Sequence, residues 1–132
     1  LKAKVEAGAD YIVTQLFFDN RDFYDFRERC ELAGIRVPII AGIMPVTTRA
    51  GMLRMADLAA GARFPARLQK AVARAESDEQ VARVGVQWAG DQISDLLSSR
   101  VSGIHLYTLN NSRSSIDICN NLGLSRFSVR SF

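Results

Sequence analysis

VPIIAGIM, at residues 37–44, is the stretch that indicates the fold class, because it is apolar throughout and rich in β-branched side chains. An unbroken apolar run, rather than an alternating one, is typical of a strand buried on both faces of a parallel sheet. Pro38 is tolerated at the start of such a strand, and Pro45 follows its end. We therefore expect a parallel strand here.

Two other stretches have the same character, YIVTQLFF at residues 11–18 and GIHLYTL at residues 103–109. Helical spacing of apolar residues fills the sequence between and after them, and the opening residues resemble the tail of a helix that stops at Gly8. The predicted order is β-α-β-α-α-α-β-α, which favours parallel pairing through right-handed crossovers. The helices are expected at residues 20–34, 49–60, 66–75, 78–100 and 112–122.

The pattern leaves two architectures open: an open three-stranded α/β layer, or part of a closed barrel, which needs eight strands and roughly 250 residues. With 132 residues, 48% apolar and 23% charged, the chain has the composition of a soluble globular domain. No apolar run reaches the roughly 20 residues of a membrane span, so we expect no membrane partner. The chain starts at Leu1 rather than methionine, which suggests a piece of something longer.

Charge and cysteine content exclude several classes of function. The net charge is +3 and the basic residues are scattered, so we expect no nucleic-acid partner. Cys30 and Cys119 form no CxxC pair and have no histidine cluster nearby, which argues against a disulfide framework and a zinc site. Both fall on the apolar stripes of predicted helices, and a reducing, cytoplasmic setting fits them.

Candidate site residues follow from the rule that ligands meet the carboxyl ends of parallel strands. Gln15 is an amide inside an apolar strand; it is either a core glutamine bonded to its neighbours or a ligand contact that both donates and accepts. For Asp19 we favour the role of a helix cap. His105 is more often structural in such a position, and Tyr107, on the same strand face, either binds a ligand or closes the core.

The residue types and their spacing do not indicate a particular reaction. The sequence holds no GxGxxG, no P-loop and no HExxH, and its single histidine is a poor base for any of the serines. What they support is a parallel α/β piece with polar residues at its strand ends.

Four short segments, taken together, carry a family resemblance. TQLFFD at residues 14–19 resembles the TQxFFD strand of methylenetetrahydrofolate reductases, and GIMPV at residues 42–46 resembles their GIxPI strand end. RFP at residues 63–65 is similar to the R-x-P that follows, and YTLN at residues 107–110 to the last barrel strand. With Lys4 and Gly8-Ala9-Asp10 leading in, the resemblance runs from Leu1 to about Gly123.

The resemblance implies an α/β fold, a partial (β/α)8 TIM barrel with the last three βα units and parallel strands, in a single partial domain over residues 1–132. It implies a cytoplasmic FAD enzyme of one-carbon metabolism and methionine biosynthesis. In the family, NAD(P)H passes hydride to the flavin, and methylenetetrahydrofolate then receives it to give 5-methyltetrahydrofolate. The parent protein is expected to be a homo-oligomer.

The resemblance also implies residue roles. Gln15 would contact the pterin and the nicotinamide in turn, and Tyr107 would line the same opening of the barrel. Lys4 would lie near the FAD phosphates. Met55 would flank the nicotinamide, although a methionine on a predicted helix by itself favours a packing role. Asn111 falls where an arginine usually holds the folate glutamate tail, which places folate affinity in question.

Two more positions depart from the family pattern: Gly51 stands where some members have a folate-contacting glutamine, and Ala3 where some have an arginine near the flavin. The first five strands, which supply the catalytic acid and most FAD contacts, have no counterpart here. We therefore assign no catalytic residue and no metal ligand, and expect the chain alone to be inactive, with exposed apolar surface. The alternatives are a non-catalytic α/β module that completes a barrel with another chain, and a different TIM-barrel enzyme.

Overall fold

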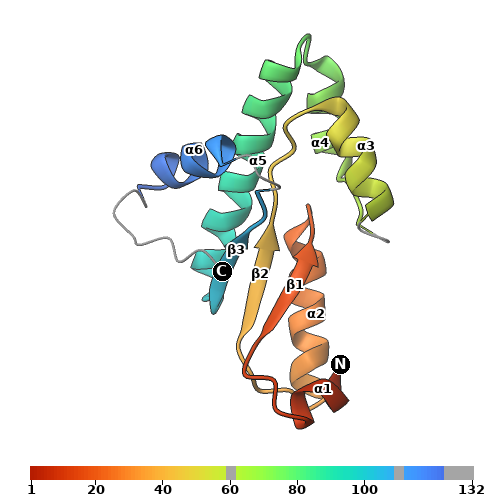
Figure 1. Ribbon diagram of the computed structural model, residues 1–132, viewed down its shortest axis with the longest axis vertical. Helices are drawn as coiled ribbons and strands as arrows, with labels where there is room; N and C mark the ends of the chain where they lie inside the picture. The colour runs from red at the N-terminus through yellow and green to blue at the C-terminus, as the bar shows by residue number, and fades with distance from the viewer. Residues whose placement is uncertain (59–61, 109–111, 124–132) are drawn as a thin grey trace.

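The computed structural model describes residues 1–58, 62–108 and 112–123, and the element order predicted from the sequence is confirmed in them (Figure 1). The strands are shorter than predicted, and the tail at residues 124–132 and the predicted strand end at Leu109 lie outside the described residues. The elements are α1 (Lys2–Glu6), β1 (Ile12–Leu16), α2 (Asn20–Leu32), β2 (Ile39–Ile43), α3 (Arg49–Leu58), α4 (Ala66–Arg74), α5 (Asp78–Ser98), β3 (Gly103–Leu106) and α6 (Arg113–Asn121).

The three strands form one sheet in the order β1-β2-β3, and both pairs are parallel, as predicted. Ile40 of β2 pairs with Val13 on one side and with Gly103 on the other. The carboxyl ends of the strands therefore meet at one end of the sheet, and α1 lies at the opposite end (Figure 1).

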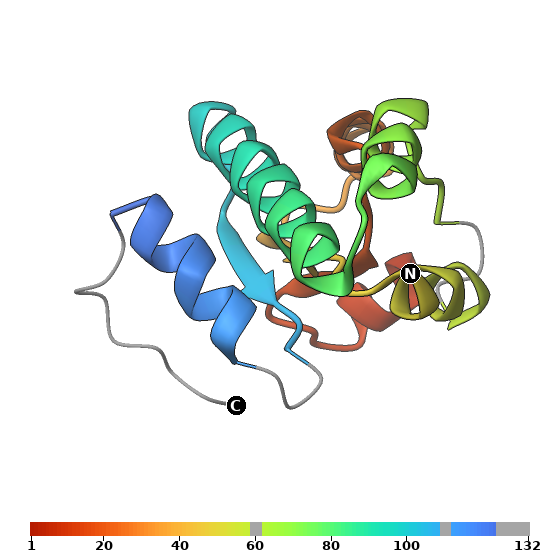
Figure 2. The ribbon, with the colours of Figure 1, turned by 90° about the horizontal axis from the view of Figure 1, so that it is seen from above.

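The helices α2 and α5 lie along the same face of the sheet (Figures 1 and 2). They bury one apolar cluster against the strands, and each valine, leucine, isoleucine or phenylalanine in it contributes about 1.5–3 kcal/mol on removal from water. The strand members of this cluster are Ile12, Ile39, Ala41 and Ile43, and the helix members are Phe23 and Cys30 of α2, Val86, Ala89, Ile93 and Leu96 of α5, and Ile118 of α6, joined by Phe17 and Ile35.

The opposite face of the sheet is only partly covered. Val13 is 39% exposed, and Ile40 is half-buried. The prediction that the β2 strand is buried on both faces is therefore wrong for Ile40, because no described helix packs over it. Together with Tyr11, which is 49% exposed, Val13 leaves apolar surface open to solvent beside β1.

A second apolar cluster lies beyond the carboxyl ends of the strands, where α3, α4 and the first turns of α5 meet. Arg49 joins two of these helices, because its guanidinium donates to the carbonyls of Val72, Ala73 and Ala75 at the end of α4. A cation there satisfies carbonyls that the helix leaves without partners. The buried members of the cluster are Phe18, Val46, Met55, Leu68, Val72, Ala75 and Val81.

Capping residues set the ends of α2. The Asp19 carboxylate accepts from the backbone N–H of Arg21 at 3.0 Å, which confirms the predicted helix cap. Gly34 follows the last turn with φ of 77°, a conformation that costs glycine little. In α5 the buried stripe ends at Leu96, and Leu97 is 49% exposed.

None of the helices in residues 1–58, 62–108 and 112–123 has the length and apolar character needed to cross a membrane.

Helix α5 ends in a left-handed turn made by an unfavourable residue. Arg100 has φ of 58°, and the backbone N–H of Val101 donates to the Leu96 carbonyl at 3.1 Å, as in a Schellman motif that normally uses glycine. We expect Arg100→Gly to raise the free energy of unfolding by about 1 kcal/mol, because the left-handed region penalises a Cβ. Urea unfolding followed by circular dichroism measures this. Arg100→Ala is the control: it removes the charge but keeps the Cβ, so an equal gain in that variant contradicts the explanation.

A polar network joins α2 to α5 on the outside of the main apolar cluster. The Tyr24 hydroxyl donates to the Asp95 carboxylate at 2.5 Å, and the Asn20 amide donates to the same carboxylate at 2.8 Å. These two hydrogen bonds lower the pKa of Asp95 below its ordinary value of 3.8. Burial, followed by the bond to Asp95, raises the pKa of Tyr24.

This network makes part of the stability depend on pH. Since the pKa of Asp95 is depressed in the folded state, its contribution is present above the unfolded-state value and is lost as the pH falls through the folded-state value. We expect Tyr24→Phe to lower the free energy of unfolding by about 1 kcal/mol at pH 7, and by less at pH 3. Urea unfolding at both pH values tests this, with the exposed Tyr11→Phe as control. A cost that stays the same at pH 3 contradicts the assignment.

Candidate functional site

The candidate site begins at a register shift in β1. Val13 pairs with Ile40 but Leu16 pairs with Gly42, so β1 holds one more residue than β2 between these pairs. At this bulge the Gly42 backbone N–H donates to the Thr14 hydroxyl at 2.9 Å. A β-bulge re-aims the side chains around it, and it is common beside functional sites.

Tyr107 lies across the middle strand at the same level. Its hydroxyl donates to the Thr14 carbonyl at 3.0 Å, and its backbone N–H donates to the Ile43 carbonyl at 2.9 Å. The ring passes over Gly42, where a Cβ would come within 2.7 Å of the Tyr107 Cε2 atom. His105 stacks edge-to-face on this ring with centroids 4.5 Å apart, which confirms that the two side chains share a face.

Gln15 lies within the bulge, and its side chain is exposed. The interpretation of Gln15 as a buried core amide is therefore wrong, because the bulge and the open edge of β1 leave it uncovered. It lines a largely apolar hollow of about 330 Å³ beside this edge. The other lining residues include Val13, Phe17, Phe23 and Phe26.

The remaining candidates are not gathered with Gln15 and Tyr107. Lys4 is exposed on α1, which lies at the amino ends of the strands (Figure 1). Met55 is only 5% exposed and belongs to the second apolar cluster, as its packing interpretation predicted. Asn111 lies outside the described residues.

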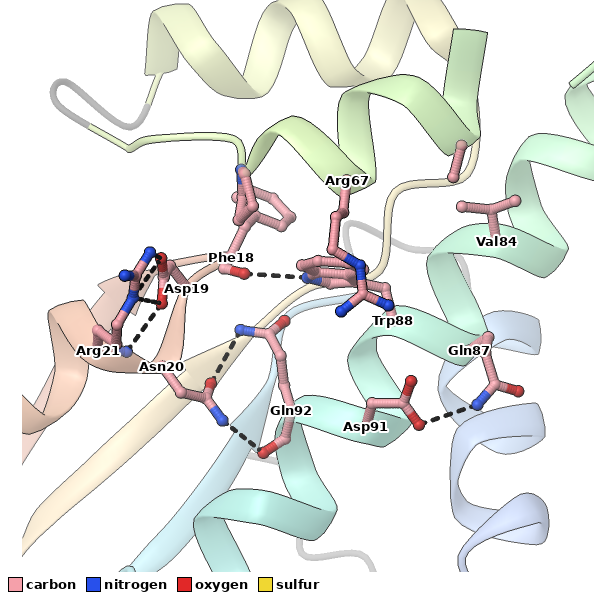
Figure 3. A pocket seen from close by; sticks show the side chains of 12 residues that line it. Phe18, Asp19, Asn20, Arg21, Arg67, Val84, Gln87, Trp88, Asp91 and Gln92 are labelled. Carbon is pink, nitrogen blue, oxygen red and sulfur yellow. Dashed lines mark hydrogen bonds and ion pairs between the residues drawn. The ribbon is translucent and has the colours of Figure 1, made fainter. Parts of the chain in front are cut away.

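A second pocket, of about 570 Å³, lies between the turn from β1 to α2 and the helices α4 and α5 (Figure 3). Two side chains of α5 hold the backbone of this turn. The Trp88 indole N–H donates to the Phe18 carbonyl at 2.9 Å, and the Gln92 amide donates to the Phe17 carbonyl at 3.1 Å. The pocket therefore borders the turn that connects β1, the strand of Gln15, to α2.

The acidic groups of this pocket are engaged with neighbouring side chains. Hydrogen bonding from the Arg21 guanidinium lowers the pKa of Asp19, and the Gln87 amide donates to Asp91 at 2.9 Å. This arrangement offers no poised acid or base among the residues that line it.

Sequence reasoning missed Thr14 and Gln92. Gln92 has a visible signal, because it follows the buried Gly85 and Ala89 at spacings of seven and three and so falls on the stripe of α5. Thr14 has none, since its importance depends on a bulge that the residue types do not announce.

Comparisons with known proteins point to one family. The sequence model of the methylenetetrahydrofolate reductase family matches residues 1–123. The chain is 43% identical over 125 residues to methylenetetrahydrofolate reductase (NADH) 1 of Arabidopsis thaliana. The matched segment covers 94% of this chain and 21% of that protein. It is 38% identical over 125 residues to 5,10-methylenetetrahydrofolate reductase of Escherichia coli, covering 94% of this chain and 42% of that protein.

A solved structure is similar in fold. An uncharacterized protein from Clostridium thermocellum, described as binding two copies of 5-methyl-5,6,7,8-tetrahydrofolic acid, has a TM-score of 0.54 at 16% identity and covers 89% of this chain and 44% of that chain. This likeness concerns the fold. With three parallel strands in the order of a partial (β/α)8 barrel, and a family match over nearly its whole length, the chain belongs to the methylenetetrahydrofolate reductase family.

Proposed function

We propose that this chain forms the substrate side of an enzyme that reduces 5,10-methylenetetrahydrofolate to 5-methyltetrahydrofolate with FAD and NAD(P)H. The observation that carries the proposal is the meeting of Gln15, Gly42 and Tyr107 at the carboxyl ends of adjacent strands, within sequence that matches the family. The chain spans less than half the length of the curated relatives it matches. The activity therefore belongs to a barrel whose other strands come from outside this sequence.

One residue of this chain is proposed to contact the flavin. Lys4, the only residue assigned to the FAD phosphates, lies on α1, at the opposite end of the sheet from the carboxyl ends of the strands (Figure 1). We propose that the remaining strands hold most of the flavin and that this chain, taken alone, is inactive. Proximity and electrostatic stabilisation need all of these groups on one scaffold.

Within that enzyme, the exposed Gln15 amide binds two partners in turn. A carboxamide both donates and accepts, so it can match the edge of a pterin and the carboxamide of a nicotinamide. Asn111, a neutral residue where the family usually has arginine, weakens the hold on the folate glutamate tail. A cytoplasmic setting and a homo-oligomeric parent complete the proposal.

A chimera tests the proposal. Residues 1–123 replace the matched segment of the Escherichia coli enzyme, and the purified product is assayed for bound flavin by absorbance and for NADH-dependent reduction of methylenetetrahydrofolate. We expect a yellow, active protein. A folded, flavin-bound chimera that oxidises NADH with an artificial acceptor but never reduces the folate contradicts the proposal and favours a different TIM-barrel enzyme. A folded chimera that binds no flavin favours a non-catalytic module.

In the active chimera, Gln15→Glu is expected to lower kcat/KM for the folate about 10- to 100-fold, because a carboxylate has lost the donor half of the amide. Steady-state kinetics measures this. The control is Gln80→Glu. The Gln80 side-chain oxygen accepts from the Glu76 N–H at 2.8 Å, and a glutamate oxygen can accept the same bond. Equal activity of the Gln15 variant and the control removes Gln15 from the site.

A further inference from the structure

Thr14 of β1 forms hydrogen bonds with Gly42 of β2 and with Tyr107, which follows β3. Its hydroxyl accepts from the Gly42 N–H at 2.9 Å, and its carbonyl accepts from the Tyr107 hydroxyl at 3.0 Å. Tyr107 in turn continues the β2–β3 pairing through its bond to the Ile43 carbonyl. We call these two hydrogen bonds of Thr14 the Thr14 junction.

The junction exists because of the bulge. Between the two pairs that flank it, β1 advances three residues, from Val13 to Leu16, while β2 advances two, from Ile40 to Gly42. The extra residue takes a backbone carbonyl of β1 out of the regular ladder. The Thr14 hydroxyl takes over as the acceptor for the Gly42 N–H, and the Thr14 carbonyl is left for Tyr107.

The absence of a side chain at Gly42 is the second requirement. A Cβ there would lie 2.6 Å from the Thr14 carbonyl oxygen and 3.3 Å from the Gln15 carbonyl oxygen. Because Gly42 lacks it, the Tyr107 ring crosses β2 and reaches β1 beside Gln15. Both proposed binding residues therefore have their positions set next to the same residue, Thr14.

We propose that Thr14 is a positioning residue, which holds Gln15 and Tyr107 in the geometry that binds the substrate; this role rests on the proposed function. It also sets the chemistry that Tyr107 offers. The phenol proton is committed to the Thr14 carbonyl, so toward a bound molecule Tyr107 presents its oxygen lone pair and its ring. The group that faces it is therefore a hydrogen-bond donor or a flat ring, while Gln15 supplies the donor on this side of the site.

The first test measures amide hydrogen exchange in the ¹⁵N-labelled full chain. In Thr14→Val we expect the Gly42 amide to exchange about tenfold faster than in the wild type, since a β-branched side chain of the same shape lacks the acceptor. In Thr14→Ser, which keeps the hydroxyl, the rate stays within about twofold. The Ile12 amide, bonded to the Pro38 carbonyl at 2.9 Å, is the internal control and stays unchanged in both.

Two outcomes of this test overturn the proposal: Gly42 exchange in Thr14→Val that equals the wild type, or an equal acceleration in Thr14→Ser. Neither depends on enzyme activity. If Thr14→Val does not fold, Thr14→Ser and Tyr107→Phe still decide the matter, because Tyr107→Phe removes only the second bond and must leave the Gly42 amide protected. Loss of that protection in Tyr107→Phe also overturns the junction.

The second test separates positioning from mere support of the fold. In the active chimera, Thr14→Val is expected to raise KM about tenfold for the folate and for NADH, because Gln15 is proposed to contact both, with kcat within about threefold, and Thr14→Ser restores both KM values. An unchanged KM overturns the positioning role and leaves the proposed function intact. An inactive wild-type chimera contradicts the proposed function instead, and the exchange rates alone then decide whether Thr14 fixes this geometry.

Discussion

Gly85→Ala is expected to lower the free energy of unfolding by about 3 kcal/mol or more, the upper end of what overpacking costs. Gly85 faces the loop after β2 from the second turn of α5, and a Cβ there would lie 1.7 Å from the Val46 carbonyl oxygen and 2.7 Å from its carbon. The obstacle is backbone rather than a flexible side chain, so relief requires α5 to move away from the strands. Urea unfolding of the full chain, followed by circular dichroism, measures the loss.

Gly90→Ala is the matched control on the same helix. Nothing lies within 4 Å of a Cβ at Gly90, so the substitution adds only helix propensity. We expect it to raise the free energy of unfolding by up to about 1 kcal/mol. Opposite signs for the two glycines support close packing of α5 on Val46. A Gly85→Ala variant as stable as the wild type contradicts the close contact between Gly85 and the Val46 backbone.

Gly42→Ala is expected to disrupt the candidate site and to lower the free energy of unfolding by about 1–3 kcal/mol. Its Cβ would meet the Thr14 carbonyl oxygen at 2.6 Å and the Tyr107 ring at 2.7 Å. The ring is the part that can move, so we expect the hydrogen bond from Tyr107 to Thr14 to break first. In the active chimera, KM for the folate should rise about tenfold or more, the equivalent of one lost interaction of about 1.4 kcal/mol.

Gly103→Ala is the control for this effect. Gly103 pairs with Ile40 in the same sheet, but a Cβ there would make contacts no closer than 3.6 Å, and only with the Ile40 side chain. Its stability and KM should stay close to those of the wild type. If Gly42→Ala and Gly103→Ala behave alike, the crossing of Tyr107 over β2 does not shape the site.

The local sequence determined the elements and their order. Strands of continuous apolar residues and helices with apolar stripes were predicted within a few residues of their observed ends, and the cap at Asp19 was confirmed, because these features depend on neighbours in the chain. The parallel pairing followed from the alternation of strands and helices. The family was indicated by four short segments and is confirmed by the match over residues 1–123.

Burial of particular side chains was beyond local reasoning. Gln15 was a candidate for the core because its strand is apolar, yet it is exposed, while Gln92, whose one signal is its place on the stripe of α5, is only 6% exposed. Exposure depends on which elements pack over a residue. At Gln15 the open edge of β1 and the bulge decide this, and at Gln92 the nearby turn from β1 to α2 decides it.

By itself, then, the sequence determined the α/β order, the parallel strands and the family, because short-range hydrogen bonding and hydrophobic periodicity are encoded residue by residue. Only the tertiary structure decided the roles of Thr14, Gly42 and Gly85. Two glycines that look alike in α5 differ because one of them touches the backbone of Val46. Thr14 matters because a bulge places its hydroxyl and carbonyl opposite groups 28 and 93 residues away along the chain. Such contacts arise from the meeting of distant segments, which no local pattern specifies.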